Sequence, residues 1–216
     1  MSFLMRVQVP DRPGSLGLLA TALGTAGVDI LSVDVVERGS TTAVDDLVVE
    51  IPRGSFPETL ITAAEAIDGV QVVSVWPFSG VLDTHRELEL IDSVAATIGD
   101  RLQVLVDGLP RVLSVGWSMI FASGADGPYR VVGSPATPQT QHSAAAWLPL
   151  RKPLALDLDA DWVPQSWREM DTTMAAAPLG SDLRIVLIGR PGGPEFRPSE
   201  VARLGHMAGI VATVLG

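Results

Sequence analysis

The feature that most restricts the fold is the changing hydrophobic periodicity of the first eighty residues. Met5, Val7 and Val9 alternate with polar residues, which is the spacing of a strand with one buried face. The spacing becomes helical over residues 16–26 and alternates again over 28–37. A hairpin turn, a third strand, a second helix and a last strand follow. This β-α-β-β-α-β order predicts an antiparallel four-stranded sheet with both helices on one face.

The connections in this segment have the residues that turns and helix ends require. Pro13 and Gly14 suit a tight turn, since Pro presets φ and Gly accepts a positive φ. Ser15 is the predicted N-cap of the first helix. Ser55 and Glu58 have the spacing of a capping box for the second. The predicted architecture is a ferredoxin-like sandwich.

Two short motifs in this segment resemble the ACT domain. Asp11-Arg12-Pro13-Gly14-Ser15-Leu16 joins a strand to an Ala-rich helix, and Gly27-Val28-Asp29-Ile30 enters the next strand. The resemblance covers about residues 3–78 and implies a regulatory module that binds amino acids or similar small metabolites. Such sites usually form where two ACT domains pack side by side, so a homodimer is expected. The residues implied at the ligand are Asp11, Pro13, Gly14, Ser15, Leu16, Asp29 and Ile30.

Elementary electrostatics agrees with these positions. The first N–H groups of the helix, at Ser15, Leu16 and Gly17, have no intrahelical partners and lie at the positive end of its dipole, where a carboxylate binds well. Asp11 or Asp29 could accept hydrogen bonds from an ammonium group. A purely structural interpretation stays open, because Asp before Pro-Gly is a common turn former and Asp29 could cap or face solvent. Many ACT domains have Asn at these two places, which leaves the ligand's identity open.

The remaining residues predict a second α+β domain. We expect an ACT-type ligand-binding domain at 1–79, a linker at 80–86 and a second domain at 87–216. Leu88, Ile91, Ala95 and Ile98 predict its first helix, and a second helix is expected to break at residues 108–110. Strands are expected at 112–121, 129–133, 172–179 and 183–189, and a closing amphipathic helix at 201–215.

This order of elements resembles a GAF-like domain, over about residues 86–216, with a central antiparallel sheet. Residues 177–215 are similar to the typical GAF ending, in which a strand pair leads through Phe196 into the terminal helix. The resemblance implies a small-molecule-binding domain. Covalent attachment of a bilin is excluded because the chain has no Cys, and no N-K-F-D-E signature of cyclic-nucleotide binding is present.

Three of the five tryptophans fall in the long irregular segment at 134–171. Trp147, Trp162 and Trp167, together with Trp117 on a predicted strand, could line a second, apolar pocket. The alternative is that these large side chains anchor the segment to the core, which a long loop needs to stay folded.

Composition excludes several classes of function. The net charge is −10, from 15 basic and 25 acidic residues, and no basic stripe suits a nucleic-acid backbone. Without Cys there are no disulfides, thiolate nucleophiles or Cys-ligated metals. Neither an export signal nor a membrane span is recognisable, so we expect a cytoplasmic protein that does not bind membranes.

The catalytic and metal-binding templates do not match. Gly116-Trp117-Ser118 starts like a nucleophile elbow, but Ile120 stands where Gly belongs. The acidic stretch 157–161 lacks the Gly and Glu of a calcium loop, so no metal or cofactor is expected. The sequence therefore predicts a non-catalytic regulatory protein that binds a small metabolite, above all an amino acid. The alternatives are a structural protein that assembles through the ACT sheet without a ligand, and an enzyme with its site under the Trp-rich segment.

Overall fold

The computed structural model describes residues 1–78, 85–139, 148–161, 163 and 165–216. The chain divides into two compact units, unit 1 (residues 1–82) and unit 2 (residues 83–216). Each has its own hydrophobic core. Most of the expected linker at 80–86 lies outside the described residues, and Arg86 is already the first residue of a helix.

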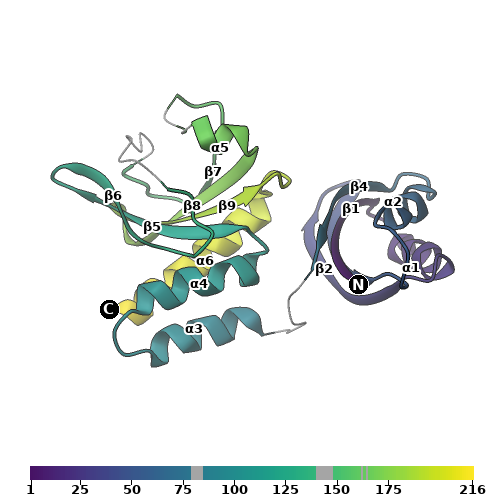
Figure 1. The fold of residues 1–216 in the computed structure, drawn as a ribbon, viewed down its shortest axis with the longest axis horizontal. Helices are drawn as coiled ribbons and strands as arrows, with labels where there is room; N and C mark the ends of the chain where they lie inside the picture. The colour runs from purple at the N-terminus through teal and green to yellow at the C-terminus, as the bar shows by residue number, and fades with distance from the viewer. Residues whose placement is uncertain (79–84, 140–147, 162, 164) are drawn as a thin grey trace. The chain divides into compact units, whose positions relative to one another are not determined.

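Unit 1 consists of β1 (Ser2–Pro10), α1 (Ser15–Thr25), β2 (Asp29–Arg38), β3 (Thr42–Glu50), α2 (Glu58–Glu65) and β4 (Gln71–Pro77). The strands form one sheet in the order β2-β3-β1-β4, with every neighbouring pair antiparallel. Both helices lie on one side of this sheet (Figure 1). Leu19, Leu23 and Leu60 from the helices pack against Met5 and Val7 in a fully buried cluster. The predicted order and the four-stranded sheet are therefore present.

The simple alternation expected for β1 is wrong at one position. Arg6 lies on the face away from the helices, yet only 5% of it is exposed. Its Nε and Nη2 donate hydrogen bonds to the two carboxylate oxygens of Asp46, at 2.7 and 2.8 Å. Burial of a charged group requires this kind of bidentate pairing, because an unpaired buried charge is strongly unfavourable. The face of the sheet that points away from the helices therefore contains a buried ion pair.

Two of the predicted helix caps are also wrong. Gly14, with φ of +94°, is the N-cap of α1, and Ser15 is the first helical residue with a buried side chain. The turn geometry thus starts this helix without a side-chain cap. The helix α2 begins at Glu58 and has no side-chain cap. Ser55 instead belongs to the preceding turn, where its N–H bonds to the carbonyl of Pro52.

The edge strand β2 departs from the buried pattern expected of its alternation. Leu31, Val33 and Val35 are 37%, 43% and 56% exposed. The cause is the strand order, which puts β2 at the border of the sheet, away from the centre that the helices cover. Unit 1 therefore presents three apolar side chains along an edge strand whose outer side pairs with no other strand in the described part of the chain.

Unit 2 contains α3 (Arg86–Ala96), α4 (Arg101–Leu113), β5 (Trp117–Gly124), β6 (Gly127–Gly133), β7 (Leu154–Leu156), α5 (Gln165–Glu169), β8 (Thr172–Ser181), β9 (Arg184–Pro191) and α6 (Pro198–Leu215). The five strands form an antiparallel sheet in the order β6-β5-β9-β8-β7. In Figure 1, α3, α4 and α6 lie on one side of it and α5 on the other. The two hairpins and the closing helix agree with the sequence prediction, whereas β7 and α5 have no counterpart there.

The buried side of α3 agrees only in part with the residues that predict this helix, since Ile91 packs partly buried against the core. Leu90 and Val94 are buried, whereas Leu88 is 65% exposed. Ile98, at 99% exposed, lies beyond the last residue of the helix. Helical periodicity therefore predicted the helix but placed Leu88 and Ile98 on a buried side that they do not occupy.

The helix α4 continues through the predicted break. Pro110 lies inside it, and the strand expected from residue 112 begins only at Trp117. A proline lacks the N–H that would bond to the carbonyl four residues earlier, here that of Val106. The hydroxyl of Ser118 donates to this carbonyl at 2.6 Å and replaces the missing bond. Gly108 serves close packing, since a Cβ there would lie 2.4 Å from Cδ1 of Leu90.

We predict that Ser118→Ala lowers the free energy of unfolding of unit 2 by about 1–3 kcal/mol, because a buried carbonyl loses its donor. Ser93→Ala is the matched control. Its exposed hydroxyl also donates to a helix carbonyl, that of Glu89, and its removal should change stability by no more than about 0.5 kcal/mol. Chemical denaturation of both variants measures the difference. Equal losses would show that the Ser118 bond has no special role.

Candidate functional site

The end of β1 and the start of α1 form the first candidate site. The N–H of Asp11 bonds to the carbonyl of Thr41 at 2.9 Å, which fixes the turn against the start of β3. The Asp11 carboxylate accepts hydrogen bonds from Nη2 and Nε of Arg38, at 2.8 and 3.3 Å. Their side chains are 20% and 70% exposed, so solvent reaches this ion pair. A carboxylate and a guanidinium are thus held together beside the start of a helix.

The first turn of α1 adds backbone donors to this pair. The N–H of Ser15 bonds to the carbonyl of Arg12 at 3.3 Å, and the N–H of Leu18 begins the helical ladder at the carbonyl of Gly14. The N–H groups of Leu16 and Gly17 therefore come before that ladder. No acidic side chain lies in this first turn. Pro13, Gly14 and Leu16 are exposed, whereas Ser15 is buried. Of the predicted ligand residues, the structure therefore brings Asp11, Pro13, Gly14 and Leu16 to one exposed corner.

Asp29 and Ile30, which the ACT resemblance also implies at the ligand, lie elsewhere in the protomer. Both β1 and β2 are antiparallel to β3, so they run parallel to each other. Arg38, at the end of β2, is therefore near Asp11, and Asp29 is at the opposite end of the same strand. Nine residues of extended chain span about 30 Å. Within one protomer, Asp11 and Asp29 cannot contact the same small ligand.

Asp45 is the residue that the sequence analysis missed. It lies on the helix-facing side of β3, in register with Val7 and Val35, and only 1% of it is exposed. Its Oδ1 is buried and has no hydrogen-bond partner among the described residues. The sequence contained one indication of this position. Asp45 is separated from Leu47 and Val49 by even numbers of positions, so on a strand its side chain lies on the same inward face. Nothing local in the sequence shows what lies above it.

Electrostatics around Asp45 disfavours its charged form. Burial raises the pKa of the Asp45 carboxyl, and the negative charges of Asp46 and Asp11 raise it further. Arg38 acts in the opposite direction on this pKa. The same Arg38 has its own pKa raised by its hydrogen bond to Asp11. Asp11, Arg38 and Asp45 therefore form one electrostatic group at this end of unit 1.

The tryptophans of unit 2 are placed differently from one another. Trp117 and Trp167 are 1% and 2% exposed, with ring centroids 5.5 Å apart, inside the core that covers the sheet face opposite α6. This packing is what the anchoring interpretation expects. Trp147 and Trp162 lie outside the described residues, so a second pocket that they would line stays a prediction.

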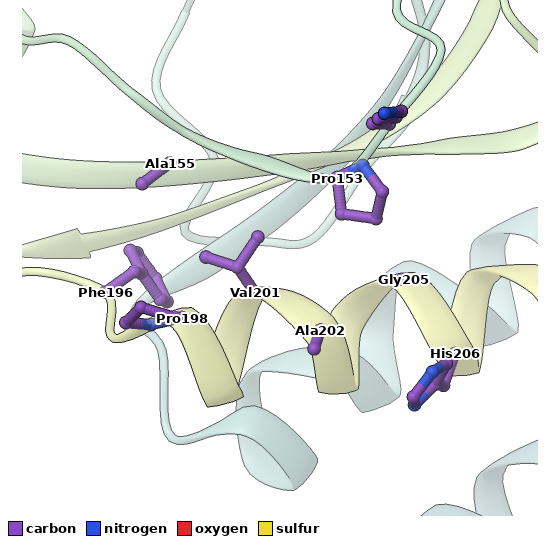
Figure 2. Close-up of a pocket in the computed structure, with 9 residues that line it drawn as sticks. Pro153, Ala155, Phe196, Pro198, Val201, Ala202, Gly205 and His206 are labelled. Atoms are coloured by element: carbon purple, nitrogen blue, oxygen red, sulfur yellow. The ribbon is translucent and has the colours of Figure 1, made fainter. Parts of the chain in front are cut away.

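Two surface hollows lie away from the predicted residues. One, of about 690 Å³, is between α6 and the edge strand β7, and Lys152 and His206 are among its lining residues. Figure 2 shows Phe196 and Val201 extending from the helix side toward the strand that carries Ala155. The other, of about 960 Å³, lies between α1 and α2 and is lined mainly by Ala and Thr. Neither contains a predicted ligand or pocket residue.

The serine of the partial nucleophile elbow and the possible metal ligands can be located within the described part of the chain. Ser118 is fully buried and donates to a helix carbonyl, so it is not positioned as a nucleophile. Among the described residues, no three His, Cys, Asp or Glu side chains are grouped closely enough to hold a metal ion. Within the same residues, no helix has the length and apolar character that crossing a membrane requires.

Comparison with known proteins gives likenesses of structure only. No family model and no curated protein matches the sequence. A GAF domain of A. aeolicus NLH2, in an inactive state, is 13% identical, covering 61% of this chain and 93% of its own, with a TM-score of 0.42. A far-red-absorbing protein in its dark state with bound biliverdin is 10% identical (60% and 97% covered, TM-score 0.44). A bacteriophytochrome of R. palustris is also 10% identical (83% and 41% covered, TM-score 0.44).

All three TM-scores lie below 0.5. The strand order and packing of the two units show a mixed α+β protein with two antiparallel sheets. None of the three is described as an ACT domain, and the ACT assignment of residues 3–78 stays a prediction.

The Oδ1 of Asp45, which has no hydrogen-bond partner among the described residues, leads to a prediction about stability. Asp45→Asn should stabilise unit 1 at neutral pH, by on the order of 1 kcal/mol, because it removes a buried charge whose Oδ1 has no hydrogen-bond partner among the described residues. A folded-state pKa above the unfolded value means that stability is fully present below the unfolded pKa and is lost as pH rises through the folded one. The advantage of the variant should therefore shrink as pH falls toward the ordinary aspartate pKa of about 4.

Denaturation at several pH values checks this, with Asp68→Asn as control. Asp68 is an exposed carboxylate in the turn after α2, and its replacement should change stability little at any pH. An Asp45→Asn protein less stable than wild type at neutral pH would contradict the prediction.

Proposed function

We propose that the chain is a non-catalytic regulatory protein that binds a small metabolite, an amino acid, at the start of α1. The observation that carries this proposal is the exposed Asp11–Arg38 pair beside an acid-free helix N-terminus. An amino acid is a zwitterion, and this corner presents both complementary charges to solvent. The resemblance of Asp11 and the following residues 12–16 to the ACT motif supports the same ligand class.

The charges assign a role to each group. The α-carboxylate of the ligand binds Arg38 and the N–H groups of Leu16 and Gly17, where the helix dipole favours an anion. The ammonium group binds the Asp11 carboxylate. In the free protein Asp11 and Arg38 neutralise each other, so the ligand exchanges one ion pair for two complementary contacts.

The exposed edge of β2 supports a homodimer as part of this proposal. Pairing of β2 with β2 of a second copy would cover Leu31, Val33 and Val35 and satisfy the free backbone groups of the edge. If the strands pair antiparallel about their centre, Asp29 of the partner subunit lies opposite Arg38. Asp29 and Ile30 lie far from the Asp11 site of their own protomer, but in such a dimer they would reach the Asp11 site of the partner.

A ligand screen tests the binding proposal. A ligand at one hundred times its dissociation constant stabilises the native state by about 2.7 kcal/mol, which for a domain of this size raises the melting temperature by about 10 °C or more. We expect at least one of the twenty amino acids, at millimolar concentration, to raise the melting temperature of unit 1. Asp11→Asn and Arg38→Gln should each remove most of that rise.

The control is Arg53→Gln, an exposed arginine in the loop before α2, at the far end of the sheet. It should keep the full shift. If no amino acid shifts the wild-type protein, or if Asp11→Asn and Arg38→Gln respond like Arg53→Gln, the proposed site is wrong.

The dimer is tested separately by light scattering after size exclusion. Val35→Lys places a charge on the β2 edge and should convert the dimer to a monomer. Val73→Lys places the same charge on β4, the opposite edge strand, where the valine is 39% exposed. It should leave the dimer intact. A wild-type protein that is strictly monomeric, or a dimer broken only by Val73→Lys, would refute assembly through β2.

A further inference from the structure

Asp45 has a position that packing does not explain. Its neighbours across the strands are Val7 and Val35, and it lies in the inward row of β3 that otherwise holds Ala43, Leu47 and Val49. An apolar side chain in that row would be stabilising. A buried carboxyl oxygen without a hydrogen bond is costly and needs a reason.

The charged groups around Asp45 do not neutralise it. Asp46, the next residue, points to the other face of the sheet and is bound to Arg6. Asp11 carries the same sign of charge as Asp45. Arg38 favours ionised Asp45, but its guanidinium is hydrogen-bonded to Asp11. A cationic group from outside the chain would complete the arrangement.

We propose that Asp45 receives the ammonium group of the ligand and so restricts the site to compounds with a free primary amine. This inference rests on the proposed function and deepens it. An ammonium group has three donors and no acceptor, which suits a corner with two carboxylates, Asp11 and Asp45. Arg38 is then released from Asp11 and turns its planar donors to the ligand carboxylate.

The burial of Asp45 explains why it, and not Asp11, decides between ligands. A charge-assisted hydrogen bond made away from water is stronger than one made in an exposed position. A hydroxy acid or keto acid of the same shape keeps the carboxylate contacts but leaves Asp45 without its cation. The site should therefore discriminate strongly against ligands that lack the amine.

Proton linkage follows from the same contact. Asp45 must be ionised to bind an ammonium group, while burial and the charges of Asp46 and Asp11 favour its protonated form against the opposing effect of Arg38. Ligand affinity should therefore rise with pH through the titration of Asp45. At pH values below the pKa of Asp45, where its carboxyl is protonated, ligand binding should release a proton to the buffer.

Titration calorimetry on the full chain tests the inference with matched ligands. The probes are the amino acid that gives the largest thermal shift and its α-hydroxy acid counterpart. Wild type should bind the amino acid at least 100-fold more tightly than the hydroxy acid. Asp45→Asn should lose about 100-fold affinity for the amino acid, keep its affinity for the hydroxy acid and remain at least as stable as wild type.

The controls separate this inference from the proposed function. Asp68→Asn should retain wild-type affinity for both probes. If wild type binds the amino acid but Asp45→Asn binds it equally well, only the role of Asp45 is refuted. If wild type binds no amino acid at all, the proposed function and this inference both fail. Stabilisation by NaCl or MgCl₂ that replaces the amino acid and disappears in Asp45→Asn would identify a simple cation site and would also overturn the inference.

Discussion

The position of β3 between β1 and β2 is the constraint on which the candidate site of unit 1 depends. Because both neighbours run antiparallel to β3, their ends meet at the same end of the sheet. The chain leaves β1 at that end to enter α1, so Asp11 and Arg38 come together beside the helix N-terminus. The same strand order leaves β2 at the border of the sheet with its apolar side chains exposed. One pairing pattern thus sets both the charged corner and the surface that a second copy would cover.

Local pattern predicted the elements of unit 1 well, because periodicity and turn residues act over a few neighbours. The start of α1 was predicted only in part. The turn at Gly14 was expected, but the N-cap was assigned to Ser15, whose side chain is buried. The position of Asp29 relative to Asp11 could not be predicted from local pattern. Its distance from Asp11 depends on pairing between strands that are far apart in sequence, which no local rule contains. The burial of Asp45 was not predicted for the same reason, since it depends on which side chains cover the sheet.

Unit 2 illustrates the same limit through a single hydrogen bond. Gly108 and Pro110 are residues that end helices, and the sequence therefore predicted a break. The break does not occur because Ser118, on the next strand, supplies a donor to the carbonyl of Val106. Close contact with Leu90 gives Gly108 a packing role in the helix. A residue from a neighbouring element thus supplies the hydrogen bond that the helix cannot make by itself. As a result α4 is longer, and β5 begins later, than the local sequence predicts.

Regulation by a ligand requires two states that the ligand binds with different affinity. On the proposal made for Asp45, the free protein is the strained state, because a buried carboxyl oxygen has no hydrogen-bond partner among the described residues. An amine-bearing ligand supplies that cation and at the same time draws Arg38 away from Asp11. Binding would then change the charge on an exposed corner next to the β2 edge and remove an internal destabilisation of the sheet. The residue that selects the ligand would also be the one through which binding alters the stability of unit 1, which couples recognition to response without a large movement of the backbone.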